Sequence, residues 1–432
     1  MRIAILGAGL QGTCIALELA RRGSVVELLD QDELPLNRAS LRNEGKVHLG
    51  FVYAKDPTLR TARLMLRGAL GFRPLLSRWT GGMFDRLAPS TPFQYLVPDD
   101  SSWSPLDLGE HYAAVQRLYE EELLRPGVDY LGARPARLWR RLEPREYAPF
   151  AAAERLQAGF TTVEVSVPVH ETAAVLRGAV SAHPGIRPRM GHRVQEVART
   201  ASGFRVEGAR ADGARWSLEC DQVVNALWEG RLAIDGGLGL PPTRPWVHRL
   251  KYRVMVELPE RLRGIPSFTF VLGAYGDVVA YGDGHAYVSW YPECLKGWSA
   301  DIEPPAGWAP ACTGRLPRAE QTAIARRVLD AFDRLVPGLA QARVLAVDGG
   351  VIFAWGSTDI TDPTSELHRR DDTGVLSVDG YHSVNTGKLT TAPLFAVEAA
   401  DRVAGRAAHA LPDAGDALLP RAPLGPARGA GR

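Results

Sequence analysis

The stretch MRIAILGAGLQGTCIALELARRGSVVELLD, residues 1–30, decides the fold of this chain. Residues 2–6 are a short run of apolar and β-branched residues, which favours a buried parallel strand, and the turn GAGLQG follows at residues 7–12. Residues 13–22 are expected to form a helix, and residues 25–29 a second buried strand that ends on Asp30. The order of strand, glycine turn, helix and strand predicts a dinucleotide-binding unit.

The three glycines of this turn have separate physical roles. Gly7 makes the tight turn, Gly9 lets the backbone approach a pyrophosphate, and Gly12 lets the helix lie close to the strand. The helix then offers unpaired N–H groups and a positive dipole end to the anion. Asp30 follows Gly12 by 18 residues, a position suited to hydrogen-bonding a ribose diol. A 2′-phosphate would be repelled there, so NADP is disfavoured, while NAD and FAD both remain open. The alternative is a glycine-rich turn in some other α/β protein.

Length and composition set outer limits on function. The chain has 432 residues, which suggests two or three folding units, and its formal net charge is +2. Lys and Arg do not cluster as a nucleic-acid-binding face requires, so no nucleic-acid partner is expected. No HExxH spacing or His/Cys cluster predicts a metal site, and no GxSxG predicts a nucleophile elbow. Four cysteines stand far apart without a CxxC, which favours unpaired thiols in a reducing compartment: Cys14, Cys220, Cys294 and Cys312.

No leader or membrane span is expected from the sequence. The first strand begins at residue 2, which leaves no room for a signal peptide before it. No stretch approaches the roughly 18 unbroken apolar residues of a membrane helix. We therefore predict a cytoplasmic protein. The Ala-, Gly-, Pro- and Arg-rich segment 406–432 is expected to be a disordered tail.

Two further stretches carry chemistry. SLRNEGKVHLGFVY, residues 40–53, returns the chain after the second strand, and by itself it is also compatible with a surface loop. GYHSVNTGKLTTAPLFAVEAADRVAG, residues 380–405, indicates a strand, a turn at Gly387 and a long helix with Pro393 in its first turn. Residues 387–391 therefore form a second helix N-terminus that can face an anion or developing negative charge. The alternative is an ordinary glycine-capped turn.

These stretches resemble segments of the FAD-dependent oxidoreductases that include D-amino acid oxidase, glycine oxidase, 2-hydroxyglutarate oxidase and glycerol-3-phosphate dehydrogenase. Residues 40–53 resemble the flavin-contacting segment of that family. DQVVNALW, residues 221–228, resembles its "VVNA" segment beside the pyrophosphate, and residues 387–391 resemble "GGKLTT" around the pyrimidine edge of the flavin. The resemblance covers residues 1–53, 161–228 and 345–405. One departure is Asp30, where the family usually has Glu; the shorter acid still reaches a ribose.

The resemblance implies an α/β fold and a set of FAD contacts. The fold is an FAD-binding Rossmann-like domain of the glutathione-reductase type, formed by segments 1–90, 160–245 and 340–405, with an inserted antiparallel-sheet substrate domain at 91–159 and 246–339. Some members of the resembling family attach the flavin covalently through a cysteine toward the C-terminus; here no cysteine follows Cys312, so the resemblance implies non-covalent FAD. The cofactor-binding residues that we predict are Gly7, Gly9, Leu10, Gln11, Gly12, Asp30, Gln31, Ser40, Asn43, Gly45, Lys46, His48, Val194, Asn225, Ala226, Gly387, Lys388, Leu389 and Thr390.

The substrate domain has its own pattern. Residues 246–293 contain aromatic, alternating segments separated by Gly and Pro turns, which is typical of an antiparallel sheet with one face toward a pocket. We expect Arg253 to bind a substrate carboxylate or phosphate, although a surface role is equally compatible with the pattern. Other candidates for the pocket wall are Tyr281, Tyr287, Ser289 and Trp290. Helices are expected at residues 57–79, 106–124, 135–147, 172–181 and 317–335.

The expected reaction is oxidation of a CH–NH or CH–OH bond of a small polar substrate, with hydride passing to the flavin and reoxidation by oxygen or another acceptor. Alcohol oxidation requires a base, and His48 is the first candidate, with His382 as a second. A hydrogen-bonded structural role is the alternative for His48. Two other functions stay open, an FAD-dependent monooxygenase using NAD(P)H and an NAD-dependent dehydrogenase or non-catalytic dinucleotide-binding protein.

Overall fold

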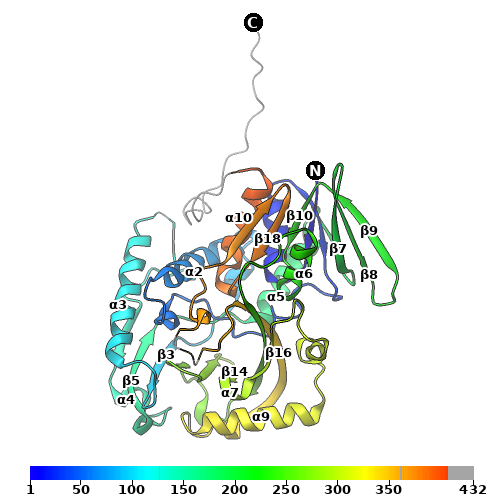
Figure 1. Cartoon of the computed structure of the whole chain (residues 1–432). Helices are drawn as coiled ribbons and strands as arrows, with labels where there is room; N and C mark the ends of the chain where they lie inside the picture. The colour runs from blue at the N-terminus through cyan, green and yellow to red at the C-terminus, as the bar shows by residue number, and fades with distance from the viewer. Residues whose placement is uncertain (126, 361, 363, 407–432) are drawn as a thin grey trace.

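The structure is a computed structural model that describes residues 1–125, 127–360, 362 and 364–406 (Figure 1). The predicted tail at 406–432 therefore lies outside the described residues, apart from Arg406. Two large sheets organise the molecule. In Figure 1 the strands of the smaller one, with β10 and β18, lie in the upper part, and the larger one lies below it with the helix α9 along its lower edge.

The first sheet contains the predicted N-terminal unit. Among the described residues it has six strands in the order β17-β18-β10-β1-β2-β6. Neighbouring strands are parallel, except that β17 is antiparallel to β18. Ile3, Ala4, Ile5 and Leu6 are completely buried, as a strand covered on both faces requires. The strands are β1 (Arg2–Leu6), β2 (Val25–Leu29), β6 (Ile186–Arg189), β10 (Gln222–Asn225), β17 (Gly374–Val378) and β18 (Tyr381–Asn385).

Helices and a small meander cover this sheet. One hydrophobic cluster joins the helices α1 (Leu10–Arg21), α5 (Val169–Ala182) and α10 (Ala392–Val403) to buried residues of β1 and β2. The antiparallel strands β7 (Arg193–Thr200), β8 (Gly203–Ala209) and β9 (Arg215–Cys220) share another cluster with β1 and β10, next to the short helix α6 (Arg231–Gly237). A turn that contains Asp212 and Gly213 connects β8 to β9.

The second sheet has nine strands within the described ranges, in the order β15-β11-β14-β13-β12-β3-β5-β4, with β16 on the other edge of β11. All pairs are antiparallel except β12 with β3. The strands are β3 (Phe93–Pro98), β4 (Trp139–Leu142), β5 (Leu156–Thr162), β11 (Trp246–Glu257), β12 (Ser267–Phe270), β13 (Gly276–Ala280), β14 (His285–Trp290), β15 (Leu295–Ser299) and β16 (Arg343–Trp355).

The two faces of β11 are different, and this positions the site. Leu250, Tyr252 and Val254 belong to a hydrophobic cluster that includes residues of α9 (Arg318–Asp333). Side chains of a strand alternate between its faces, so Lys251 and Arg253 point to the opposite side. The other helices are α2 (Arg60–Trp79), α3 (Pro105–Glu122), α4 (Pro144–Tyr147), α7 (Tyr291–Cys294) and α8 (Ala309–Cys312).

Two predictions about this second region need correction. Residues 135–147 do not form one helix, because Trp139 to Leu142 pair with β5 and the helix α4 covers only one turn after Pro144. Residues 343–355, which we assigned with 340–405 to the nucleotide-binding segments, form β16 and pair with β11 along its length. The sequence of residues 343–355 has no strong turn signal at its ends, so its alternating pattern was not enough to identify this strand.

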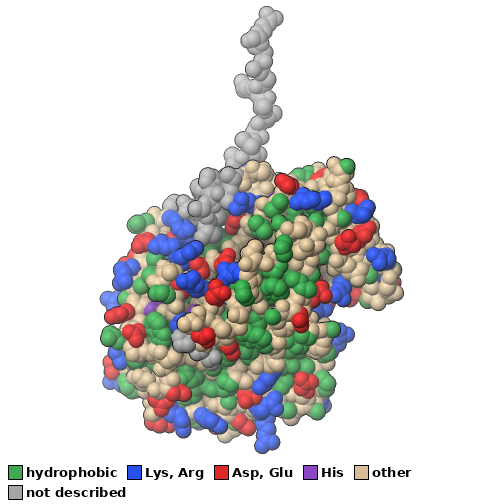
Figure 2. Space-filling model, in the orientation of Figure 1, with side chains coloured by type: hydrophobic (Ala, Val, Ile, Leu, Met, Phe, Trp, Pro, Cys, Tyr) green, Lys and Arg blue, Asp and Glu red, His purple; other side chains and the backbone are tan. Residues whose placement is uncertain are grey.

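The surface carries no single-sign charge over the face shown in Figure 2, where Lys and Arg side chains are interspersed with Asp and Glu. None of the helices among the described residues combines the length and the apolarity that crossing a membrane requires. The described part of the chain also brings together no group of three His, Cys, Asp or Glu side chains that could hold a metal ion.

Candidate active site

One cavity of about 570 Å³ is lined by residues that follow the carboxyl ends of β1, β2 and β10, and by residues of the second sheet. Ligands of open α/β sheets bind at this end of parallel strands. The first and last motifs meet there, since Thr386 Oγ1 donates to Gln11 Oε1 at 3.0 Å and Gln11 Nε2 donates to the Ala392 carbonyl at 3.1 Å. Residues 7–11 and 386–389 therefore belong to one site.

The glycine turn is built for close backbone approach. Gly7 has φ +91°, and a Cβ there would stand 2.7 Å from the carbonyl oxygen of Ala226. A Cβ on Gly12 would stand 1.8 Å from the Gly7 oxygen, so the helix can lie this close only without a side chain. Gly9 is the N-cap of α1, and the Leu10 N–H donates to Ser40 Oγ at 2.9 Å. The turn thus presents a helix N-terminus to the cavity.

Asp30 lines the cavity and is held by the backbone. Its Oδ2 accepts from the Ala8 N–H at 2.7 Å and its Oδ1 from the Asp32 N–H at 2.9 Å. Burial raises the pKa of Asp30 despite these hydrogen bonds. Asp32 in turn binds Arg38 through two contacts of 3.0 Å. Val194 of β7 lines the same end of the cavity.

The turn before α10 forms the other end. Gly387 has φ +70°, and residues 387–389 line the cavity. Thr390 lies behind them, where its Oγ1 accepts from the His48 N–H at 3.0 Å and donates to the Lys46 carbonyl at 3.2 Å. The C-terminal motif therefore holds the 40–53 segment in place.

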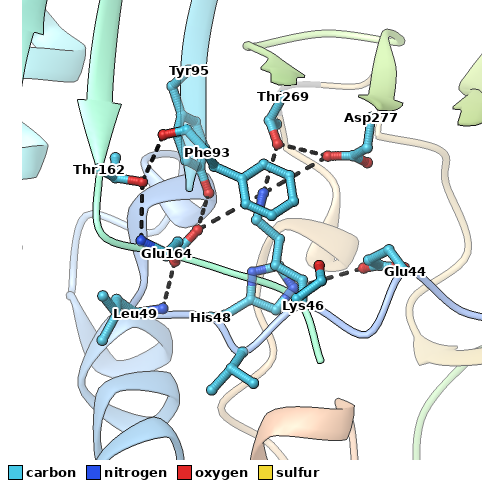
Figure 3. Close-up of polar contacts among 12 residues, drawn as sticks. Glu44, Lys46, His48, Leu49, Phe93, Tyr95, Thr162, Glu164, Thr269 and Asp277 are labelled. Atoms are coloured by element: carbon cyan, nitrogen blue, oxygen red, sulfur yellow. Dashed lines mark hydrogen bonds and ion pairs between the residues drawn. The ribbon is translucent and has the colours of Figure 1, made fainter. Parts of the chain in front are cut away.

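His48 and Glu44 form a pair in the cavity wall (Figure 3). His48 Nε2 lies 3.8 Å from Glu44 Oε1, and His48 Nδ1 is buried with no hydrogen-bond partner among the described residues. Burial lowers the pKa of His48, so the ring is neutral near pH 7. Burial also opposes ionisation of Glu44, but His48 and the charges of Lys388 and Lys251 hold the pKa of this carboxyl well below its usual range.

Lys46 lines the cavity and is fully compensated by its neighbours (Figure 3). Its Nζ donates to Thr269 Oγ1 at 2.6 Å and lies 3.8 Å from both Glu164 Oε2 and Asp277 Oδ1. The same ammonium stands 3.7 Å from the centre of the Phe93 ring, a cation–π distance. This charge is thus bound within the protein and is not free for a ligand.

Arg253, which we predicted to bind a substrate carboxylate or phosphate, does not line the cavity, whereas Lys251 does. The guanidinium of Arg253 binds Asp348 of β16 through Nε at 2.6 Å and Nη2 at 3.2 Å. A buried guanidinium that is paired in this way stays with its carboxylate, because separating them would leave an unpaired charge in the interior. The prediction that Arg253 binds substrate is therefore corrected to a structural ion pair. Of the four other candidates on this sheet, only Tyr287 is among the cavity-lining residues.

Other predicted site residues also lie away from the cavity wall. His382 donates or accepts hydrogen bonds with Ser377 Oγ at 2.8 Å and Gln222 Oε1 at 3.0 Å, near the amino ends of the parallel strands. It is therefore withdrawn as a catalytic base. Asn225 turns its side chain to Asp235 and Tyr381 instead of the cavity. Gly12, Gly45 and Thr390 support the wall from behind.

The remaining predicted contacts do line the cavity: Gly7, Gly9, Leu10, Gln11, Asp30, Gln31, Ser40, Asn43, Lys46, His48, Val194, Ala226, Gly387, Lys388 and Leu389. Sequence reasoning missed Glu44, Lys251 and Arg370. Glu44 stands inside the 40–53 segment, and Arg249, Lys251 and Arg253 alternate on one strand face, so a signal existed for the first two. Arg370 lies in an irregular segment before β17 with no such signal.

These residues fit a dinucleotide that carries a redox ring. Side chains at Gly7 or Gly12 would clash with the backbone of the turn, backbone N–H groups hold Asp30 where it can bind a ribose, and the turn before α10 lines the other end of the same cavity. The unpartnered Nδ1 of His48 stands at that second end. A second cavity of about 360 Å³ shares Arg370 and Gly387 with the first.

Comparisons with known proteins agree with this geometry. A family model described as FAD dependent oxidoreductase matches residues 2–402. Iminodiacetate oxidase from Chelativorans sp. BNC1 has a similar structure, with a TM-score of 0.64 and 20% identity over 94% of this chain and 96% of that one. Glycine oxidase from Geobacillus kaustophilus is also similar, with a TM-score of 0.66 and 15% identity over 94% of this chain and 96% of that one.

The third comparison is with L-alpha-glycerophosphate oxidase from Mycoplasma pneumoniae, whose structure contains FAD. Its TM-score is 0.60, with 14% identity over 93% of this chain and 94% of that one. A search of curated protein sequences finds no match. At these identities the similar structures establish the fold alone.

Proposed function

The chain belongs to the family of FAD-dependent oxidoreductases, and from this premise we propose that it oxidises a CH–NH or CH–OH bond of a small polar substrate. One observation carries the proposal. A single cavity is lined by the Gly7 turn at one end and by residues 387–389 at the other, with His48 in the wall of the second end. A cofactor held at both ends would bring its ring beside His48.

We assign the parts of FAD to the two ends of the cavity by their chemistry. The turn at residues 7–12 suits the pyrophosphate, and Asp30 suits the ribose. Val194 lies at the adenine end, and residues 387–389 suit the pyrimidine edge of the ring. When bound, FAD supplies the acceptor for the two electrons of a hydride.

Cys312 is the cysteine in the cavity wall. Burial raises the pKa of its thiol to about 11, which disfavours the nucleophilic thiolate. The other three cysteines are buried elsewhere. We therefore propose that FAD is dissociable.

The oxidation removes a hydride from carbon and a proton from the attached nitrogen or oxygen. His48 is neutral near pH 7, because burial lowers its pKa, so it can accept this proton. The carboxylate of Glu44, 3.8 Å from Nε2, would stabilise the imidazolium that forms. Thr390 holds the backbone of His48 and so fixes the position of this base.

The test is a visible spectrum of the purified protein, followed by anaerobic addition of amino acids, hydroxy acids, amino sugars and polyol phosphates. Flavin bands that bleach with one of these compounds, and not with NADPH, support the proposal. Bleaching by NADPH alone would favour a monooxygenase, and a colourless protein that takes up nicotinamide would contradict FAD chemistry. Peroxide formation against dye reduction would then identify oxygen or another electron acceptor.

A further inference from the structure

Part of the cavity wall comes from a segment that the predicted cofactor contacts do not include. Residues 303–312 stand between β15 and α9, and seven of these ten residues line the cavity, among them Glu303, Pro305 and Trp308. The segment falls within the range 246–339 that we predicted as part of the substrate domain. A stretch that the sequence assigns to substrate binding is therefore built into the cavity of the dinucleotide.

The 303–312 segment is fixed to the second sheet. Trp308 lies against β15, where a Cβ added to Gly297 would stand 2.4 Å from the indole ring. Ala311 and Cys312 are buried in the hydrophobic cluster that also contains residues of β11 and α9. The position of the segment is thus set by the second sheet and not by the parallel strands that carry the glycine turn.

Both ends of the segment approach elements of the nucleotide-binding half. Glu303 Oε2 lies 3.8 Å from Nη2 of Arg193 in β7, next to Val194, which we assigned to the adenine end. Just after the other end, a Cβ added to Gly314 would stand 3.1 Å from Nη2 of Arg42. The Arg193 and Glu303 side chains are 60% and 53% exposed, so their ion pair is a weak one. The segment therefore runs along the cavity between these two points.

The surfaces that meet at this end are apolar. Pro304, Pro305 and Ala306 line the cavity from the side of the segment. Val194 and Ile234 line it from the nucleotide-binding half, where Val194 packs against the hydrophobic cluster that contains Ile234. Among the residues that the structure describes, the ion pair of Arg193 and Glu303 is the one polar contact between the segment and β7. Such walls suit the faces of a flat base better than they suit a phosphate.

We propose that the 303–312 segment is a cofactor-binding element that closes over the adenosine end of FAD, with the adenine between the segment and β7. The ion pair of Arg193 and Glu303 fastens it, and its separation from β7 lets the cofactor enter and leave. The inference rests on the orientation of FAD given under the proposed function. It assigns to the second sheet a part in how long the cofactor stays bound.

Hydrogen exchange of backbone amides tests this contact. The full-length protein, freed of FAD, is placed in deuterated buffer alone, with ADP or with FMN, which carry the adenosine half and the ring half of the cofactor. ADP at about ten times its Kd should slow exchange of the segment about tenfold, because opening then requires ligand release. The Trp308 N–H, which donates to the Pro305 carbonyl at 3.0 Å, reports this opening. FMN should leave the segment unchanged.

An internal control and the opposite outcomes come from the same samples. Residues 260–265 belong to the second sheet region but do not line the cavity, so their exchange should be equal in all three samples. Protection of the 303–312 segment by FMN alone, or equal slowing of the control residues, would overturn the proposal. So would an unprotected segment in a protein that binds FAD. A protein that binds no flavin, with the segment still protected by ADP, would contradict the proposed function and leave the adenosine contact standing.

Charge reversal in the holoenzyme tests the ion pair. Glu303→Lys places two like charges together, and we expect FAD to be released about twofold to fivefold faster, the range that an exposed ion pair allows. Combining it with Arg193→Glu restores opposite charges and should return the rate toward that of the unaltered protein. The fluorescence of free flavin after dilution measures release.

Glu260→Lys is the matched control. Glu260 is exposed and pairs with Arg263 at 3.1 Å outside the cavity, so this variant should release FAD as the unaltered protein does. Release from Glu303→Lys at the rate of this control, or a double variant that releases FAD as fast as Glu303→Lys alone, would show that the ion pair does not fasten the segment.

Discussion

The two ends of the cavity are built in different ways. At the glycine end, much of the wall comes from the continuous stretch of residues 7–40, and Val194 of β7 and Ala226, which follows β10, are added to it. Backbone N–H groups bind Asp30, and Arg38 binds Asp32. At the redox end, the wall is assembled from the 40–53 segment, β11, the segment at Arg370 and the turn at Gly387. Its cations Lys251, Arg370 and Lys388 have no direct partner among the described residues.

This difference separates cofactor binding from substrate selection. A backbone-built site depends on glycines and on strand order, so it can be predicted from a short sequence and it specifies a common cofactor. A site built from single side chains on distant segments depends on how these segments pack. The predictions below test whether the two ends are independent in this way, and they run from the largest expected effect to the smallest.

Gly9→Val should remove the cofactor. A valine at the N-cap of α1 would fill the space over the helix N-terminus and press on Ser40 Oγ, which a Cβ alone would approach to 3.4 Å. We expect a folded protein without flavin absorbance. The control is Gly178→Ala in α5, where the added Cβ meets nothing within 4 Å and flavin content should not change. A yellow Gly9→Val protein would place the pyrophosphate elsewhere.

His48→Ala should keep FAD but slow its reduction by substrate by about 100- to 10,000-fold if the substrate is an alcohol, since this is the usual contribution of a general base. His382→Ala is the matched control, because its ring is bound to Ser377 and Gln222 away from the cavity. Anaerobic stopped-flow reduction measures both variants. Equal rates for the two variants would return His48 to a structural role.

Lys388→Met should reduce kcat by about tenfold and remove an alkaline limb of the pH profile. The pKa of Lys388 is about 8, so its charge is present below that pH and is lost as the pH rises through it. A cation at this turn stabilises negative charge that develops beside it. Steady-state rates between pH 6 and 10 would show the limb. A variant that retains it would assign the limb to another group.

Glu44→Gln should shift the acidic limb of kcat/KM to lower pH, by about one unit or less. The carboxylate raises the pKa of His48 against the effect of burial, so its removal makes His48 harder to protonate. Activity that depends on neutral His48 then persists to a lower pH. A shift toward higher pH would show that Glu44 does not interact with the base in this way.

Sequence patterns predicted the strands of the N-terminal unit because each is a short, mainly apolar run, the first followed by Gly7 and the second preceded by the turn at Gly23, and β1 and β2 begin and end where expected. They failed at residues 135–147, where pairing with β5 overrode helical spacing. For Arg253, alternation indicated the correct face of β11 but not whether the guanidinium is already paired with a carboxylate of the protein. Only the position of Asp348 on β16, 95 residues away in the sequence, decides that.

By itself, the sequence determined the dinucleotide fold, the glycine turn and the second helix N-terminus, because these depend on backbone conformation and on neighbours within about thirty residues. The tertiary structure alone decided that Gln11 meets Thr386, that Arg253 is bound by Asp348, and that Lys251 and Arg370 line the cavity without a direct partner among the described residues. Charge compensation depends on side chains from distant segments, and their distances exist only once the two sheets have packed together.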